Sequence, residues 1–132
     1  MTKERKIRVG VFIVFLVIIV ALHLMPKPEN TNIISVFYNY YLIDILLPCY
    51  LVIMLTLSLD RLPEKLLGRR NLITIFIALF VFLIGFTVET LQYFDLQILG
   101  TTFDPFDYLM YLFGVVLGLS VDRGIIIISK NF

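Results

Sequence analysis

The sequence is poor in the residues on which most metal and redox sites depend. Its 132 residues contain one cysteine, Cys49, and one histidine, His23. A single cysteine excludes a disulfide within the chain, and Cys49 lies in an apolar run where it is expected to pack as a small hydrophobe. The sequence contains no HExxH pattern and no nucleophile beside a base. These patterns therefore identify no catalytic residue, and neither a metal nor a cofactor is expected.

Charge is scarce as well. Charged residues make up 16% of the chain and hydrophobic residues 60%, against a usual apolar fraction of about 45–50% in soluble domains. A soluble domain of this size leaves much of its surface exposed, so it could not bury so many apolar side chains. The lipid bilayer is therefore the expected partner. A net charge of +1 gives no indication of nucleic-acid binding.

Four apolar runs account for most of the chain, at about 9–25, 41–59, 72–94 and 106–128. Each is close to the length of about 17–25 residues that a membrane-spanning helix needs, and none shows the alternation of a strand. The sequence thus predicts an all-α fold, an integral membrane four-helix bundle formed by one domain, 1–132. The first run is expected to remain as a span. Its apolar core exceeds the about 7–15 residues of a signal peptide, and no cleavage site precedes Pro26.

Positive charge is distributed unequally between the two sides of this arrangement. With four spans, every lysine and arginine except Lys27 falls on one side. Such residues gather on the cytoplasmic side of membrane proteins, so both termini are expected in the cytoplasm. The segment 33–40 is expected to form a short helix along the membrane surface, and Pro48 is expected to kink the second span.

Most acidic and amide side chains near the spans fall at the opposite, outer face. These are Asp44, Glu89, Gln92, Asp104 and Asp107, with His23 at the same level. Glu89 lies inside an apolar run, and acids placed inside a membrane are functional candidates by default. Asp104 and Asp107 have a simpler interpretation, because Asp-Pro-x-Asp is typical of a helix start with Asp104 as its cap. Asp44 and His23 are also compatible with ordinary interfacial positions.

Two stripes at helical spacing bring these residues together. In the third run Gly85, Glu89 and Gln92 share a face, and in the fourth run Asp107 and Tyr111 share a face with the pair Gly114 and Gly118. Small residues at this spacing allow membrane helices to approach closely. The third and fourth spans are therefore expected to pack face to face, with Glu89 close to Asp107 in an inward-facing acidic pocket.

These motifs resemble those of the VanZ-like family. The resemblance covers Glu89-Thr90-Leu91-Gln92, the segment Gly100 to Asp107, and then Tyr111, Gly114 and Gly118. Members of that family are small bacterial membrane proteins of four or five spans. This chain departs from the pattern at Thr101, where the family usually has arginine, and at Tyr111, where asparagine is common. The name-giving member is associated with resistance to teicoplanin, so the resemblance implies a cell-envelope context in the bacterial cytoplasmic membrane.

The resulting hypothesis is a membrane protein that engages a lipid or a lipid-like glycopeptide in the outer leaflet. Its ligand-binding residues would be Glu89, Gln92, Asp104, Asp107, Tyr111 and Asp44. One alternative is a proton or cation transporter subunit, in which the carboxylates serve as hard oxygen ligands and the chain forms an oligomer. Another is an enzyme with Glu89 and Asp107 as acid and base. A third is a structural accessory subunit of a larger membrane partner.

Overall fold

The computed structural model describes residues 3–25, 32–59, 69–94 and 103–131. Predictions about Lys27, Thr101 and the rest of 26–31, 60–68 and 95–102 lie outside the described residues. The helices are α1 (Lys3–Leu24), α2 (Ile33–Val36), the π-helical turn η1 (Phe37–Tyr41), α3 (Leu42–Ser58), α5 (Arg70–Tyr93) and α6 (Pro105–Asn131). The segment expected to form a short surface helix is helical, as α2 and η1.

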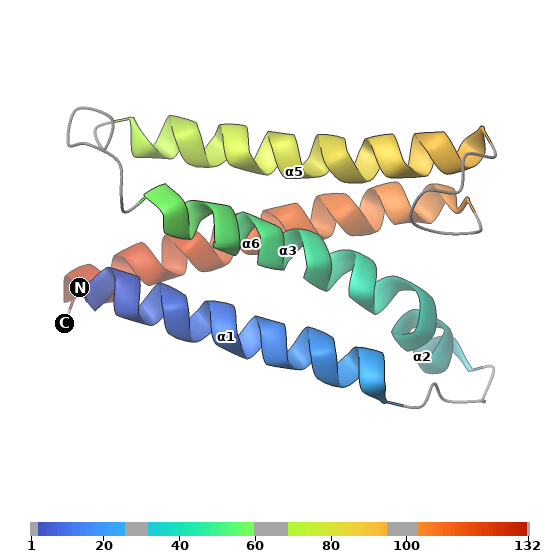
Figure 1. Cartoon of the computed structure of the whole chain (residues 1–132), viewed down its shortest axis with the longest axis horizontal. Coiled ribbons are helices and arrows are strands. Elements are labelled where there is room, and N and C mark those ends of the chain that lie inside the picture. The colour runs from blue at the N-terminus through green and yellow to red at the C-terminus, as the bar shows by residue number, and fades with distance from the viewer. Residues whose placement is uncertain (1–2, 26–31, 60–68, 95–102, 132) are drawn as a thin grey trace.

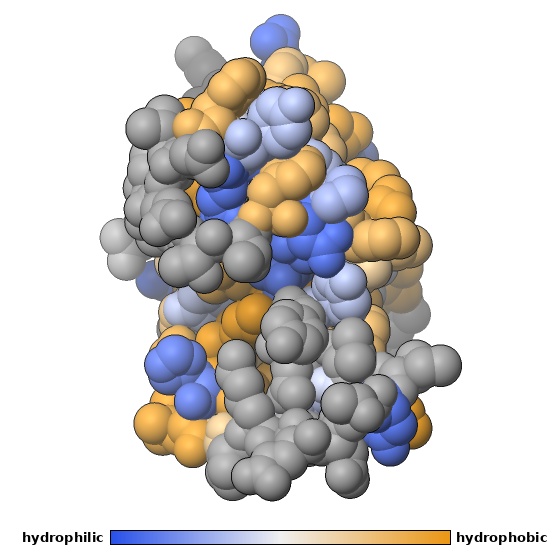
Figure 2. Space-filling model, turned by 90° about the vertical axis from the view of Figure 1, so that its right-hand side faces the viewer, coloured by the Kyte–Doolittle hydropathy of each residue, from blue (hydrophilic) through white to orange (hydrophobic). Residues whose placement is uncertain are grey.

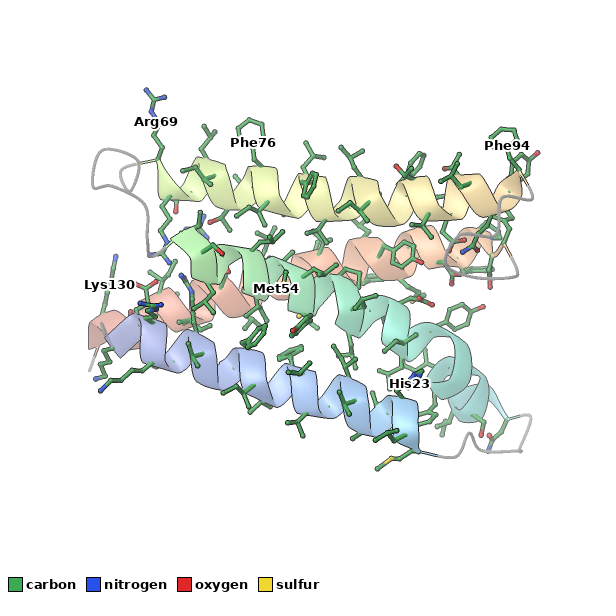
Figure 3. The ribbon with its side chains drawn as sticks, viewed as in Figure 1. His23, Met54, Arg69, Phe76, Phe94 and Lys130 are labelled. Carbon is green, nitrogen blue, oxygen red and sulfur yellow. The ribbon has the colours of Figure 1, made fainter. Side chains whose placement is uncertain are left out.

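Four long helices form one bundle, which confirms the predicted all-α architecture (Figure 1). Helix α3 lies at its centre and contacts α1, α5 and α6, and α6 also packs against α5 and α1. The described residues contain no strand. The start of α1 and the end of α6 lie at the same end of the bundle (Figure 1). Arg69 and Lys130 lie at this end too, which we call the Arg8 end; the other is the Glu89 end (Figure 3).

The distribution of side chains is that of a membrane protein. Large hydrophobic side chains cover the outside, and Phe76 of α5, for example, points away from the bundle with 60% of its surface exposed (Figure 3). The buried residues include, beside apolar ones, several polar or charged residues, among them Arg8, Thr56, Thr74, Glu89 and Asp122. Within the described residues α1, α5 and α6 are long and apolar enough to cross a bilayer. Helix α3 has 17 residues and continues directly from η1.

A small apolar core separates the two ends of the bundle. Val52 of α3, Ala78 and Val81 of α5, and Val115 of α6 are buried against one another. Each lies near the middle of its helix, between the polar residues of the Glu89 end and those of the Arg8 end. Such small and β-branched side chains allow the helices to pack closely.

The glycine pair of α6 packs against a different helix from the one we expected. A Cβ on Gly114 would collide with the backbone of Ile45, and one on Gly118 would meet Val52 and Cys49, all residues of α3. On α5 it is Gly85 that meets α6, at the ring of Tyr111. Helices α5 and α6 do pack together, but the prediction that the Gly114–Gly118 face mediates this contact is wrong. Spacing identifies a close-packing face without identifying the helix that packs on it.

Candidate ligand site at the Glu89 end of the bundle

Glu89 is the most deeply buried acid at its end of the molecule. It lies in the last part of α5 with 2% of its surface exposed, because its face of the helix turns toward α6. One carboxylate oxygen, Oε1, accepts a hydrogen bond of 3.1 Å from the hydroxyl of Tyr111. The other oxygen, Oε2, is buried and makes no hydrogen bond to a described residue. The carboxylate thus takes a hydrogen bond from Tyr111 on α6, and the backbone of Asp104 also lies close to it.

Asp104 joins the start of α6 to the segment before α3. Its Oδ1 accepts a hydrogen bond from the backbone N–H of Phe106 at 2.9 Å, which is the helix cap that the sequence predicts. Its Oδ2 accepts a second hydrogen bond, also 2.9 Å, from the hydroxyl of Tyr41 in η1. Asp104 is therefore a cap and a tether at once. The tether to Tyr41 could not be predicted, since it depends on how η1 folds over the bundle.

Asp44 and Asp107 complete a group of four carboxylates from three helices. Both are half-buried, and the charges of Asp44, Glu89, Asp104 and Asp107 act on one another. Asp107 therefore lies within electrostatic range of Glu89, although no hydrogen bond joins them. In the view onto this end, hydrophilic residues gather near the middle, with hydrophobic residues among them and along the right-hand side (Figure 2). Every lysine and arginine in the described part of the chain belongs to the opposite end.

An apolar groove adjoins this group of acids. It has a volume of about 310 Å³ and lies between α3, α5 and α6. Apolar side chains form most of its walls, and Asp44 and Tyr111 are its polar residues. The lining consists of Asp44, Leu47, Pro48, Leu51, Val81, Ile84, Gly85, Val88 and Tyr111. Leu47 and Ile84 are 43% and 42% exposed on the outer surface of the bundle, so the groove is bordered by lipid-facing side chains.

Pro48 has a direct effect on the polar part of this groove. Proline has no backbone N–H, so the carbonyl four residues earlier in the helix, that of Asp44, lacks its usual donor. Asp44, whose side chain is a carboxylate, is itself one of the residues that line the groove. Only the hydroxyl of Tyr111 supplies a donor from the groove lining, and that donor is engaged by Glu89.

Gln92, a predicted site residue, takes no part in these contacts, and neither does His23, which was expected at the same level of the membrane. Gln92 is half-buried on α5, and its side chain makes no hydrogen bond to another described residue, although its backbone oxygen accepts one from the N–H of Phe94. His23 is exposed in the last turn of α1, on the same side of the molecule as η1 (Figure 3). A pair that the sequence did not indicate, Thr90 and Tyr108, joins α5 to α6 through hydroxyl groups 3.2 Å apart.

A second polar cluster lies at the Arg8 end and was missed from the sequence. Arg8 of α1 is completely buried, and its Nη2 lies 2.7 Å from Oδ1 of Asp122 on α6, which is 1% exposed. The same nitrogen lies 2.9 Å from Glu4, which also pairs with Arg70 of α5. This network ties α1 to α5 and α6. The signals were an acid inside an apolar run and a Glu4–Arg8 pair one turn apart.

Metal ligation finds no support in this geometry. Within the described ranges no three acidic, histidine or cysteine residues lie close enough together to hold a metal ion. The carboxylates of the Glu89 end are spread over three helices and already engage the hydroxyls of Tyr41 and Tyr111. The arrangement is an acceptor-rich pocket beside an apolar groove.

Comparisons with known protein families, with curated proteins and with solved structures find no match for this chain.

Proposed function

We propose that this membrane protein holds a lipid or a lipid-like glycopeptide, with the apolar part in the groove and the polar part at the Glu89 end. The observation that supports this most is the continuity between the two. Asp44 and Tyr111 line the groove, and Tyr111 also donates to the buried Glu89. Ligand pockets are mostly apolar, with a few polar groups that orient the ligand, and have volumes of about 300–1,000 Å³. A groove of about 310 Å³ is at the lower end of that range.

The residues predicted to bind the ligand have distinct roles in this proposal. Asp44, Glu89 and Asp107 accept hydrogen bonds from the polar part of the ligand. Asp104 caps α6 and, through Tyr41, holds η1 beside the site. Tyr111 positions the Glu89 carboxylate and forms part of the groove wall. Gln92 follows Glu89 on α5 in the last turn of that helix and, in this proposal, contacts the ligand from there.

The resemblance to VanZ-like proteins supports a bacterial cell envelope as the setting of this proposed activity. With both termini in the cytoplasm, the Glu89 end would face the outer leaflet, where lipid-linked and lipid-modified envelope molecules are found. Arg8, Arg70 and the other basic residues would face the cytoplasm, in agreement with the usual distribution of positive charge.

The transporter alternative has less support from the packing. A proton or cation path would have to join the Glu89 end to the Arg8 end. The buried cluster of Val52, Ala78, Val81 and Val115 lies between them and contains no polar side chain. Within a single chain this layer would block an ion, because a charge in an apolar layer is costly. The binding proposal needs no such path.

Filling the groove tests the proposal. The protein is purified from membranes in a mild detergent, and native mass spectrometry measures the lipid-like molecules that remain bound. Leu47→Trp places a larger side chain in the groove, and Leu112→Trp places the same side chain on an exposed position of α6, since the two leucines are 43% and 46% exposed. Bound molecules are expected in wild type and Leu112→Trp and lost in Leu47→Trp. The same adducts in all three proteins would refute the proposal.

A further inference from the structure

The charge at the Glu89 end is unbalanced within the described residues. Asp44, Glu89, Asp104 and Asp107 come from three helices, and no described lysine or arginine lies near them. The Arg8 end shows the opposite arrangement, in which a buried arginine faces a buried aspartate at 2.7 Å. Buried carboxylates are normally paired with a cation or fully hydrogen-bonded, because leaving water is costly for a charge.

Glu89 supplies the second, independent observation. It is 98% buried, and its Oε2 makes no hydrogen bond to any described residue. The Tyr111 hydroxyl satisfies only Oε1. The backbone of Asp104 lies close to the carboxylate, but the nearby side chains of Asp44 and Asp107 are acceptors when charged. A molecule entering here meets acceptors and negative charge, so the site favours a ligand that brings donors and positive charge.

The groove indicates that the part of the ligand beyond its polar head is apolar. Its walls are mostly apolar, and of its two polar residues, Asp44 and Tyr111, the second donates a hydrogen bond to Glu89. A small ion would leave the groove unused, and no described set of three acids is close enough to hold a metal. An ammonium group donates three hydrogen bonds and tolerates carboxylates that are spread apart. A phosphate or sulfate head would meet like charge.

From these observations we propose that the ligand of this site is an amphiphile with a protonated amine as its head. The ammonium group lies between Glu89 and Asp44, and the alkyl chain lies in the groove. This inference rests on the proposed function and names the chemical class of its ligand. Because the site is acidic, anionic lipids are not its preferred ligands. Because the groove is apolar, an amine with an alkyl chain is expected to bind more tightly than an amine without one.

Four simple probes test the inference with the full-length protein in a neutral detergent. Decylammonium, decanol and decyl sulfate share one chain and differ in the head, and methylammonium has the head without the chain. Binding is measured by the rise in the midpoint of thermal unfolding with probe concentration. Decylammonium is expected to bind about tenfold tighter than each of the other three, or more.

Matched variants test whether Glu89 and Asp44 cause the tighter binding of decylammonium. Glu89→Gln and Asp44→Asn are each expected to reduce the advantage of decylammonium over decanol to about twofold or less. Glu4→Gln, the same change at the opposite end of the bundle, is expected to keep the full advantage. Two acidic positions are used so that poor folding of one variant, seen by circular dichroism, still leaves the other as a test.

The outcomes separate the two proposals. Equal binding of decylammonium and decanol in wild type, with both lost in Leu47→Trp, would keep the binding function and overturn the amine head. Methylammonium binding as tightly as decylammonium would overturn the amphiphile. Binding of none of the four probes would overturn both proposals. Retention of the amine preference in both Glu89→Gln and Asp44→Asn would also overturn the inference.

Discussion

The ion pair between Arg8 and Asp122 can be broken from either side, and the two sides are not equivalent. Removing one partner of a buried pair costs about 3–5 kcal/mol, because the other charge stays buried. In Asp122→Asn, Arg8 keeps Glu4 at 2.9 Å, so we expect a loss near the lower limit of about 3 kcal/mol. In Arg8→Met, Asp122 is 1% exposed and loses the one ion pair described for it, so we expect a loss near the upper limit of about 5 kcal/mol.

The assay is unfolding in mixed micelles by increasing mole fraction of SDS, followed by circular dichroism. The double variant Arg8→Met/Asp122→Leu removes both charges and is expected to recover to within about 1 kcal/mol of wild type. Arg123→Met is the control, because Arg123 is exposed and donates to Asn71 at 2.7 Å; we expect a change of about 1 kcal/mol or less. Single variants that both remain within about 1 kcal/mol of wild type would refute the reasoning.

Two further changes test packing and the buried acid. Gly114→Ala is expected to destabilise the protein by about 1–3 kcal/mol, because the added carbon collides with the backbone of Ile45. The control is Gly124→Ala in the same helix, where the added carbon has open space. It is expected to be neutral or stabilising in the same unfolding assay. Equal effects of the two would contradict the assigned α3–α6 contact. Glu89→Gln keeps an acceptor for Tyr111 and removes a buried charge, so unfolding free energy is expected to stay equal or rise by about 1–2 kcal/mol. A loss of about 2 kcal/mol or more would indicate a structural role for Glu89.

The positions of the helices along the chain were largely predictable from the sequence. Membrane helices must satisfy their backbone hydrogen bonds internally, so long apolar runs can adopt few structures in a bilayer. Helices α1, α5 and α6 overlap the first, third and fourth apolar runs, and α3 lies within the second run, 41–59. The cap at Asp104 was equally predictable, because it depends only on the residues that follow it.

The partners of individual side chains were less predictable. Spacing placed Glu89 and Tyr111 on the inner faces of their helices, and these two residues do meet. It did not reveal that Gly114 packs on Ile45, that Tyr41 reaches Asp104, or that Arg8 enters the bundle to meet Asp122. Each of these depends on which helices are neighbours and how they are rotated. Arg8 was counted only as a positive charge at the membrane surface, since its position at the start of an apolar run allowed that interpretation too.

The most direct test of the central claim, that the Glu89 end is a working site, is growth of a deletion strain on a panel of envelope-active antibiotics. The strain carries wild type, Glu89→Gln or the control Thr87→Val, whose side chain is exposed on the same helix. Membrane insertion and amount are checked for each protein. We predict that Glu89→Gln behaves like the deletion while Thr87→Val restores wild-type growth. Full restoration by Glu89→Gln would contradict the account and favour a structural role for the acids.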